Sequence, residues 1–358
     1  MKVILVIMCV LVMCTLALLY LRRLAIKVSF VDVPNGRKSH NGHVPVIGGL
    51  STLLGIWLVH LFMPDLLQYQ SEYMCLATLL VTVGLIDDKL DISATSRLVV
   101  LGILSVWLVY VEHISLSYLG NLFGYGDVYL GNWSIIITMA AVIGCITAFN
   151  MVDGIDGLLG SLASISLFGI GILFLYAGNV QVSTFCLMFT VAMLPYVFFN
   201  LGLKVKSNYK VFMGDSGSFL VGFTVIWLLV FSTQEVDSSV PVMNPVTSLW
   251  MIAVPLMDMV LVMLRRLVRR KSPFNADRTH IHHILQEYGF TPKQVLLRVS
   301  ALSIVMVLAG LIFEVINLDE NISFYLFLTS FVFYAIFIRS IEFRMRYKSI
   351  GGFRDSAL

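Results

Sequence analysis

Charged residues are scarce in this sequence. Asp, Glu, Lys and Arg make up only 13% of its 358 residues, whereas an average soluble domain carries about 25%. Short strands do not alternate with amphipathic helices as they would in a soluble α/β enzyme. Long polar segments are lacking too, because the longest one, at about 265–295, is too short to bury a core of its own. These shortages exclude a soluble enzyme and an appended soluble domain.

Cysteine is also sparse. All five cysteines lie inside apolar runs, and we expect them to be small hydrophobic residues in helix interfaces rather than disulfide partners or metal ligands. The first apolar run has no small-residue cleavage site before Arg22 and Arg23. We therefore interpret it as a retained membrane span and not as a signal peptide.

What the chain does contain is a series of apolar stretches, and hydrophobic residues make up 58% of it. Stretches of about 18–22 residues match a hydrocarbon core of roughly 30 Å when they are helical. The fold class is therefore all-α, a polytopic integral membrane protein with a single transmembrane domain over residues 1–358. We count about eleven transmembrane helices, near 3–21, 46–64, 73–87, 97–117, 133–150, 158–177, 182–200, 217–233, 245–264, 296–316 and 322–340.

The basic residues indicate how these helices face. With this set of spans, 23 of the 24 Lys and Arg residues fall on one side, and Lys2 alone falls on the other. The positive-inside rule makes the basic side cytoplasmic. The N-terminus is then outside and the C-terminus is cytoplasmic. The expected cytoplasmic segments are about 22–45, 87–97, 150–157, 201–217, 265–295 and the tail 341–358.

Four polar clusters interrupt the apolar pattern, and this topology places all of them at the cytoplasmic edge. They are Asp87-Asp88-Lys89-Leu90-Asp91, Phe149-Asn150-Met151-Val152-Asp153-Gly154-Ile155-Asp156-Gly157, Phe212-Met213-Gly214-Asp215-Ser216-Gly217-Ser218 and Arg278-Thr279-His280-Ile281-His282-His283. If the first cluster stays helical, Asp91 shares a face with Asp87 and with Asp88. Such like charges repel and raise one another's pKa unless something positive lies among them.

These residue types suit one chemistry. Carboxylates and an amide are ligands for a hard cation such as Mg²⁺, which leaves its remaining positions to water and phosphate. Arginine supplies fork-shaped donors for phosphate, and histidine supplies a donor or a proton. Acid, metal, arginine and histidine together are typical of phosphoryl transfer, where catalysis is mostly positioning and neutralisation of charge.

Each cluster also has an ordinary structural explanation. The first acids could be a solvated cap at the membrane edge, and Asp215 or Ser216 could be a helix N-cap. The arginines near 265–270 could be positive-inside charges alone. A zinc site at the histidines is disfavoured because no cysteine is near. Asp258 differs, since it lies inside the ninth expected span, where an ionisable residue is costly and usually faces a polar cavity. We expect it to support the residues that contact the substrate.

The whole pattern resembles the polyprenyl-phosphate N-acetylhexosamine-1-phosphate transferase family. The resemblance covers nearly the whole chain and includes Pro34-Asn35-Gly36-Arg37-Lys38-Ser39-His40, Pro45-Val46-Ile47-Gly48-Gly49 and the four clusters. The His-Ile-His-His motif at 280–283 is more discriminating, because the related phospho-MurNAc-pentapeptide transferases have differently spaced histidines. The similarity is greatest to the bacterial members that use UDP-GlcNAc and undecaprenyl phosphate.

The resemblance implies an enzyme of the bacterial inner membrane, active at the cytoplasmic face. It would transfer N-acetylglucosamine 1-phosphate from UDP-GlcNAc to undecaprenyl phosphate and release UMP, the first membrane step of a lipid-linked surface glycan such as O-antigen. It also implies Mg²⁺ as the cofactor, with Mn²⁺ as a substitute, and no nucleic-acid partner. A homodimer and the downstream glycan are left open.

The resemblance further assigns roles to residues of this chain. It implies catalytic roles for Asp87 and Asp88 and metal ligation by Asp215 and Asn150. The implied substrate-binding residues are Asp91, Asp153, Asp156, Arg266, Arg278, His280, His282, His283, Lys38 and His40, with Asp258 behind them.

Two mechanisms remain for the aspartate pair. One of the carboxylates could orient or deprotonate the attacking lipid phosphate, or it could attack the donor and form a covalent phospho-enzyme. We favour direct displacement, because a carboxylate that approaches a charged pyrophosphate is repelled. The alternatives to the function itself are another UDP-sugar donor (MurNAc-pentapeptide or GalNAc) and a cation-coupled transporter, which would place ionisable residues near the bilayer midplane.

Overall fold

The computed structural model describes residues 2–33, 42–110, 114–202, 209–235, 241–273 and 279–355, with side chains up to residue 345. The fold is helical, as predicted. Its helices are α1 (Lys2–Lys27), α2 (Gly48–Phe62), α3 (Gln70–Leu90), α4 (Ala94–Tyr110), α5 (Ser134–Val152), α6 (Leu158–Tyr176), α7 (Val180–Asn200), α8 (Gly214–Thr233), α9 (Pro245–Met251), α10 (Ala253–Val268), α11 (Ile281–Glu287), α12 (Pro292–Val315) and α13 (Glu320–Asp355), with one 3₁₀ turn, η1 (Gly131–Trp133).

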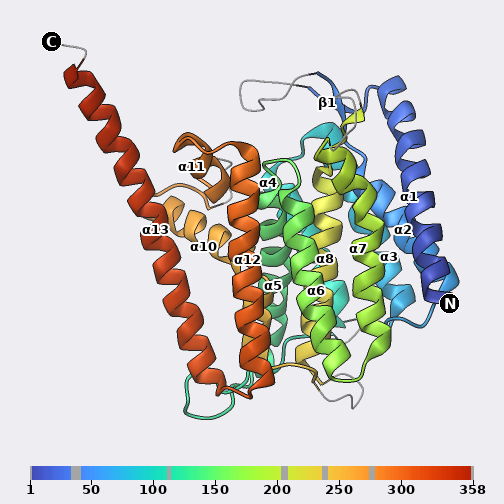
Figure 1. The fold of residues 1–358 in the computed structure, drawn as a ribbon. Helices are drawn as coiled ribbons and strands as arrows, with labels where there is room; N and C mark the ends of the chain where they lie inside the picture. The colour runs from blue at the N-terminus through green and yellow to red at the C-terminus, as the bar shows by residue number, and fades with distance from the viewer. Residues whose placement is uncertain are drawn as a thin grey trace.

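The bundle is built around α8. Of its 20 residues, 18 are buried, and α3 and α5 make the most extensive contacts with it. Figure 1 shows α8 in the middle of the bundle, with the other long helices arranged around it. A helix that is apolar on all sides must be surrounded by protein or lipid. Because α8 is surrounded by protein, the residue that begins it has a fixed position.

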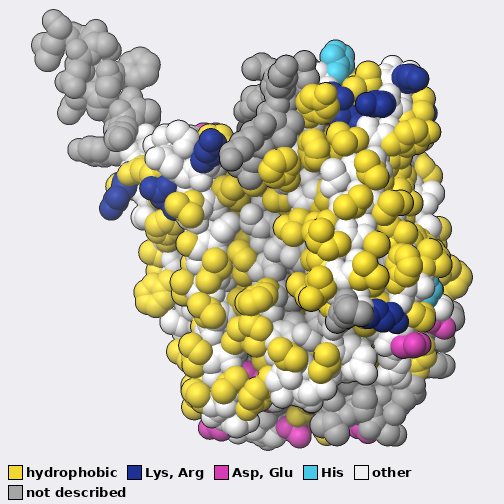
Figure 2. All heavy atoms as spheres, turned by 45° about the vertical axis from the view of Figure 1, so that its right-hand side comes forward, with side chains coloured by type: hydrophobic (Ala, Val, Ile, Leu, Met, Phe, Trp, Pro, Cys, Tyr) yellow, Lys and Arg dark blue, Asp and Glu magenta, His cyan; other side chains and the backbone are white. Residues whose placement is uncertain are grey.

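The ends of the bundle differ in charge. Figure 2 shows most of the Lys and Arg side chains on the visible face at its upper end, and most of the Asp and Glu side chains toward the lower end, with a broad hydrophobic surface between them. A hydrophobic surface between a basic end and an acidic end is the arrangement of a multi-pass membrane protein.

Ten of the eleven expected spans each fall on one helix, and the ninth falls on two, α9 and α10. Seven of the described helices are long and apolar enough to span, or eight if α9 and α10 form one bent span, while α2 and α4 are apolar but shorter. The number eleven and the direction of the termini therefore stay predictions.

The ninth expected span is not a continuous helix. It is broken at Ile252 into α9 and α10, which meet at 85°. Pro255 has no N–H to donate to the Met251 carbonyl four residues earlier, so the helical ladder fails there. The Ser166 hydroxyl from α6 donates to that carbonyl instead, at 2.7 Å. The bend is thus stabilised by a partner outside the broken helix.

Short pairings fix the start of α8. Strands β1 (Val31–Asp32) and β2 (Val44–Pro45) pair antiparallel, and the chain after β2 runs beside Phe212, whose N–H donates to the Pro45 carbonyl at 2.9 Å. The Gly48 N–H returns a bond to the Phe212 carbonyl at 2.9 Å. The segment that leads into α8 is therefore held by the segment that leads into α2.

All five cysteines are free thiols. Cys14, Cys145 and Cys186 are buried, as expected of residues in helix interfaces, whereas Cys75 is exposed.

Candidate active site

The start of α8 is capped from across the bundle by Asp88. The Asp88 carboxylate accepts hydrogen bonds from the backbone N–H groups of Asp215 at 2.8 Å and Ser216 at 3.2 Å. These two N–H groups have no partner within their own helix, and the positive end of the helix dipole favours a carboxylate there. Gly84, one turn before Asp88 on α3, permits this approach, because a Cβ at that position would lie 2.3 Å from the Ser216 Cα.

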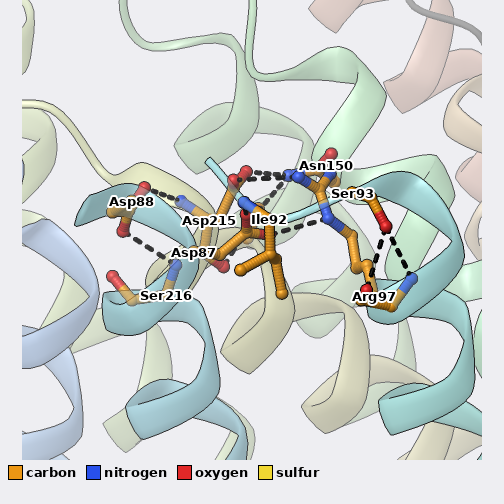
Figure 3. Close-up of polar contacts among 10 residues, drawn as sticks. Asp87, Asp88, Ile92, Ser93, Arg97, Asn150, Asp215 and Ser216 are labelled. Atoms are coloured by element: carbon orange, nitrogen blue, oxygen red, sulfur yellow. Dashed lines mark hydrogen bonds and ion pairs between the residues drawn. The ribbon is translucent and has the colours of Figure 1, made fainter. Parts of the chain in front are cut away.

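Asp87 and Asp215 are joined by a shared cation, Arg97 of α4 (Figure 3). The Arg97 Nε lies 2.7 Å from Asp87 Oδ2, and its Nη2 lies 3.5 Å from Asp215 Oδ2. Asp87 is only 2% exposed and also accepts a bond from the Ile92 N–H at 3.1 Å. A buried carboxylate needs a partner of opposite charge. Arg97 is such a partner for Asp87 and for Asp215.

Asn150, at the end of α5, also contacts Asp215 (Figure 3). Its amide nitrogen donates to Asp215 Oδ1 at 2.5 Å and to the Ser218 hydroxyl at 2.9 Å. The two residues expected to share a metal ion are therefore in direct contact.

Asp153 and Asp156 lie on the turn between α5 and α6. Asp156 is paired with Lys210, with a distance of 2.7 Å between Oδ2 and Nζ. Burial, together with the negative charges of Asp215, Asp88 and Asp156, raises the pKa of Asp153 to about 7. This part of the site thus carries excess negative charge, which a bound cation would relieve.

The His-Ile-His-His motif lies at the start of α11 and reaches the same turn. His282 is 1% exposed. It packs so closely against Gly154 that a Cβ added there would lie 2.0 Å from the His282 Nε2. The His282 ring lies parallel to that of His280, with centroids 5.8 Å apart, and it contacts His283 at 4.2 Å. Burial lowers the pKa of His282 to about 3, with a further contribution from His283, so His282 is neutral at physiological pH.

Asp258 of α10 contacts the start of the histidine motif. Its Oδ2 lies 2.8 Å from His280 Nδ1, and its Oδ1 accepts bonds from the Ile281 N–H at 2.9 Å and the Tyr334 hydroxyl at 2.8 Å. Arg266, on the same helix, is 3% exposed and donates to the Pro273 carbonyl at 2.6 Å.

Most of the predicted site residues that the structure describes thus gather at one end of the bundle. Asp91 directly follows α3, which ends at Leu90, and takes a left-handed conformation with φ 49° and an exposed side chain. The helix does not continue through Asp91, so the condition under which Asp91 would share a helical face with Asp87 or with Asp88 is not met. Lys38, His40 and Arg278 lie outside the described residues.

Sequence reasoning missed three residues of this site, namely Arg97, Lys210 and Tyr334, and it gave Ser218 no role of its own. Arg97 and Lys210 were counted only as positive-inside charges. A signal for Arg97 was present, since clustered carboxylates need a cation and Arg97 follows Asp87 by ten residues. Tyr334 had no such signal, because it lies in an apolar span far from every polar cluster.

Among the residues that the structure describes, no three or more His, Cys, Asp or Glu side chains are arranged to hold a metal ion. Mg²⁺ does not require such a set, because it is held by one or two carboxylates together with substrate phosphates and water. The donor set that the structure brings together is Asp215 with Asn150.

A helical membrane bundle with acids, an arginine and histidines at one end has the features of a membrane transferase that acts on phosphate groups. Comparison with known proteins agrees. Residues 72–233, which carry three of the four clusters, match the model of glycosyl transferase family 4. The chain belongs to this family.

Curated relatives match over almost their whole length, and they share one name, undecaprenyl-phosphate α-N-acetylglucosaminyl 1-phosphate transferase. The relative from Yersinia pestis is 40% identical over 336 residues, which cover 91% of each chain. The relative from Escherichia coli K12 is 39% identical, with 93% of this chain and 92% of the relative covered. The relative from Haemophilus influenzae is 39% identical, with 92% of each chain covered.

Proposed function

We propose that this protein transfers N-acetylglucosamine 1-phosphate from UDP-GlcNAc to undecaprenyl phosphate, at the cytoplasmic face of the bacterial inner membrane. In the reaction, an oxygen of the lipid phosphate bonds to the β-phosphorus of the donor. The bond from that phosphorus to the bridging oxygen breaks, and UMP leaves. The names of the relatives and their near-complete coverage support the substrates.

The observation that carries this proposal is the network of Asp87, Arg97 and Asp215 at the start of the buried helix α8. It combines fixed negative charge with a guanidinium that can turn toward a phosphate. A cation-coupled transporter is less well supported, because Asp258, the acid that suggested it, is engaged by His280, Ile281 and Tyr334.

The residues present fit a divalent cation. Asp87, Asp88, Asp153, Asp156 and Asp215 outnumber Arg97 and Lys210, so an anionic donor would be repelled without added positive charge. Mg²⁺, or Mn²⁺ in its place, would neutralise the donor pyrophosphate and polarise the phosphorus under attack. Asp215 and Asn150 would hold it if the Asn150 amide turned, so that its oxygen rather than its nitrogen faces the ion.

The acceptor needs a path from the bilayer to this network. A groove of about 520 Å³ lies between α4 and α5, and Thr95 is its one hydroxyl-bearing residue; the others are Leu98, Val99, Gly102, Ile103, Val106, Met139 and Ile143. Arg97 lies on the same helix, at the end where Thr95 and Leu98 line the groove. We infer that a polyprenyl chain lies in this groove and brings its phosphate to Arg97.

The contacts of the aspartate pair suggest different duties for its members. Asp88 has both oxygens bonded to the start of α8, so it holds Asp215 in place. Asp87 is paired to Arg97, which suits it to orient the arginine and the lipid phosphate. We keep direct displacement as the mechanism, and a radiolabelled phospho-enzyme formed from UDP-GlcNAc without acceptor would refute it.

The function is tested with two labels. Membranes that contain the protein are incubated with Mg²⁺, undecaprenyl phosphate and UDP-GlcNAc labelled in the sugar or in the β-phosphate. Both labels are expected in the lipid product. Transfer of the sugar label alone would refute the proposal, while failure with UDP-GlcNAc and success with UDP-GalNAc or UDP-MurNAc-pentapeptide would refute the donor alone.

A further inference from the structure

Three donors from two parts of the chain, the start of α11 and the middle of α13, converge on the Asp258 carboxylate of α10. They are the His280 ring, the Ile281 N–H and the Tyr334 hydroxyl, at 2.8, 2.9 and 2.8 Å. Asp258 is 2% exposed and Tyr334 is 5% exposed. Three donors favour the ionised carboxylate, which only accepts hydrogen bonds. The proton of a neutral His280 ring then lies on Nδ1, and Nε2 is the nitrogen that a substrate can meet.

The same carboxylate fixes the backbone that carries the histidine motif. By accepting from Ile281, Asp258 satisfies a backbone N–H at the start of α11, and it thereby sets the position of His280, His282 and His283 together. The parallel rings of His280 and His282 extend this order to Gly154 and the turn that carries Asp153. The orientation of Asp258 therefore decides the geometry of one whole wall of the site.

Tyr334 restrains that orientation. Its hydroxyl and the Ile281 N–H share Oδ1, which leaves Oδ2 for the His280 ring. The hydroxyl comes from α13, a long helix that otherwise lies at the edge of the bundle (Figure 1). Without this bond the carboxylate could rotate, and both of its bonds to the motif would weaken.

We propose that Tyr334 is a positioning residue of the transferase, which acts through Asp258 to hold His280 with its proton on Nδ1 and to present Nε2 to the UDP-sugar. This inference rests on the proposed function and adds to it a residue on the last membrane helix. It predicts an effect on the donor rather than on the lipid acceptor, because α4 and α5, which line the proposed lipid groove, do not carry these residues.

The test compares Tyr334→Phe with Tyr73→Phe in the purified full-length protein, by steady-state kinetics for each substrate and by thermal unfolding. The loss of one hydrogen bond to a carboxylate is expected to lower kcat/KM for UDP-GlcNAc about three- to tenfold. The KM for undecaprenyl phosphate is expected to stay within about twofold of the wild-type value.

Tyr73→Phe is the matched control. The Tyr73 hydroxyl is equally buried and bonds to Thr224 Oγ1 at 2.7 Å, but it lies on α3 about four turns before Asp87. It should cost thermal stability without changing either substrate's kinetics. If Tyr334→Phe lowers stability alone and leaves kcat/KM unchanged, as expected of Tyr73→Phe, the inference is wrong.

Two further measurements separate positioning from packing. In a His280→Gln background, Tyr334→Phe should lower kcat/KM less than it does in the wild type, because the part of its effect that passes through His280 is absent; a full additional loss would overturn the inference. The ¹⁵N shifts of the His280 ring, assigned with His280→Gln, should show the proton on Nδ1 in the wild type and a mixture in Tyr334→Phe. Identical spectra would also overturn it.

The spectra decide the inference even if the reaction is misassigned. If neither label of UDP-GlcNAc reaches the lipid, the proposed function fails, while the proton position on His280 still shows whether Tyr334 and Asp258 fix that ring.

Discussion

Two carboxylates of this protein are buried to the same extent but are partnered in different ways. Asp87 and Asp258 are each 2% exposed. Asp87 is paired with Arg97, whose side chain is 26% exposed and which it shares with Asp215. Asp258 is held by three donors from the buried interior, and one of these is a tyrosine on another membrane helix.

This difference separates a network that can rearrange from one that cannot. A partly exposed guanidinium between two acids can turn toward an incoming phosphate at little cost, because water and the second acid remain as partners. A carboxylate with three buried donors loses several bonds if it moves. Burial alone therefore does not distinguish a reacting acid from a positioning acid, whereas the mobility of its partners does.

The largest expected effect comes from removing the two charges in turn. Asp87→Asn should lower kcat by about 1,000-fold or more, since it removes the charge that orients Arg97 beside the reacting phosphate. Asp258→Asn should lower kcat/KM for UDP-GlcNAc by about 10- to 100-fold, the cost of weakening bonds to a charged group. Kinetics with both substrates measure the two effects. Equal losses in kcat for the two variants would remove the distinction.

Arg97 tests whether the rearranging network meets the lipid. Arg97→Ala is expected to lower kcat/KM for undecaprenyl phosphate about 100-fold, and Arg97→Lys should recover only part of that loss, because an ammonium cannot bridge two carboxylates as a planar fork does. Arg265→Ala is the control, since Arg265 is paired with Glu342 at 3.0 Å and lies away from this network. A loss confined to the donor's KM would contradict the assignment.

Asp153 predicts how pH affects the metal. Its pKa is raised from 3.8 to about 7, so between these values the folded protein keeps a proton that the unfolded chain has released. This proton stabilises the folded state at low pH, and its contribution to the free energy of unfolding is lost as the pH rises through about 7. A cation favours the carboxylate form. Mg²⁺ should thus raise the unfolding temperature more at about pH 8 than at about pH 5.5.

The comparison for this prediction is Asp153→Asn, which cannot titrate and should show a smaller difference between the two pH values. A Mg²⁺ effect that is independent of pH in the wild type would mean that the Asp153 carboxylate does not interact with the ion.

The sequence predicted the membrane fold and the position of the acids well, for physical reasons. Apolar length specifies a spanning helix and can be read locally, whereas the side that the bias of Lys and Arg assigns stays a prediction. The contact between Asn150 and Asp215 was expected from a family motif. The contact between Asp88 and the start of α8 was not, because it depends on the close approach of α3 at Gly84.

What the sequence could not predict are partners that carry no local signal. Tyr334 lies among apolar residues of α13, and only the packing of α13 against α10 reveals its bond to Asp258. The end of α3 at Leu90 was missed because the residues up to Asp91 are compatible with a longer helix. The break at Ile252 was missed as well, although Pro255 lies in the middle of the expected span, where a proline interrupts a helix.

The smallest expected effect concerns that break, which aims α10 and therefore Asp258. Ser166→Ala removes the hydroxyl that satisfies the Met251 carbonyl, and an unsatisfied buried carbonyl costs about 1–3 kcal/mol. The unfolding temperature should fall by a few degrees, at about 2–4 °C per kcal/mol. The kcat should stay within about twofold of the wild-type value, because three donors still hold Asp258.

Ser164→Ala is the control, because it removes only a bond within α6 to the Gly160 carbonyl, and it should shift the unfolding temperature less. A large loss of kcat in Ser166→Ala with normal stability would show instead that the histidine side of the site rearranges as readily as the side of Arg97.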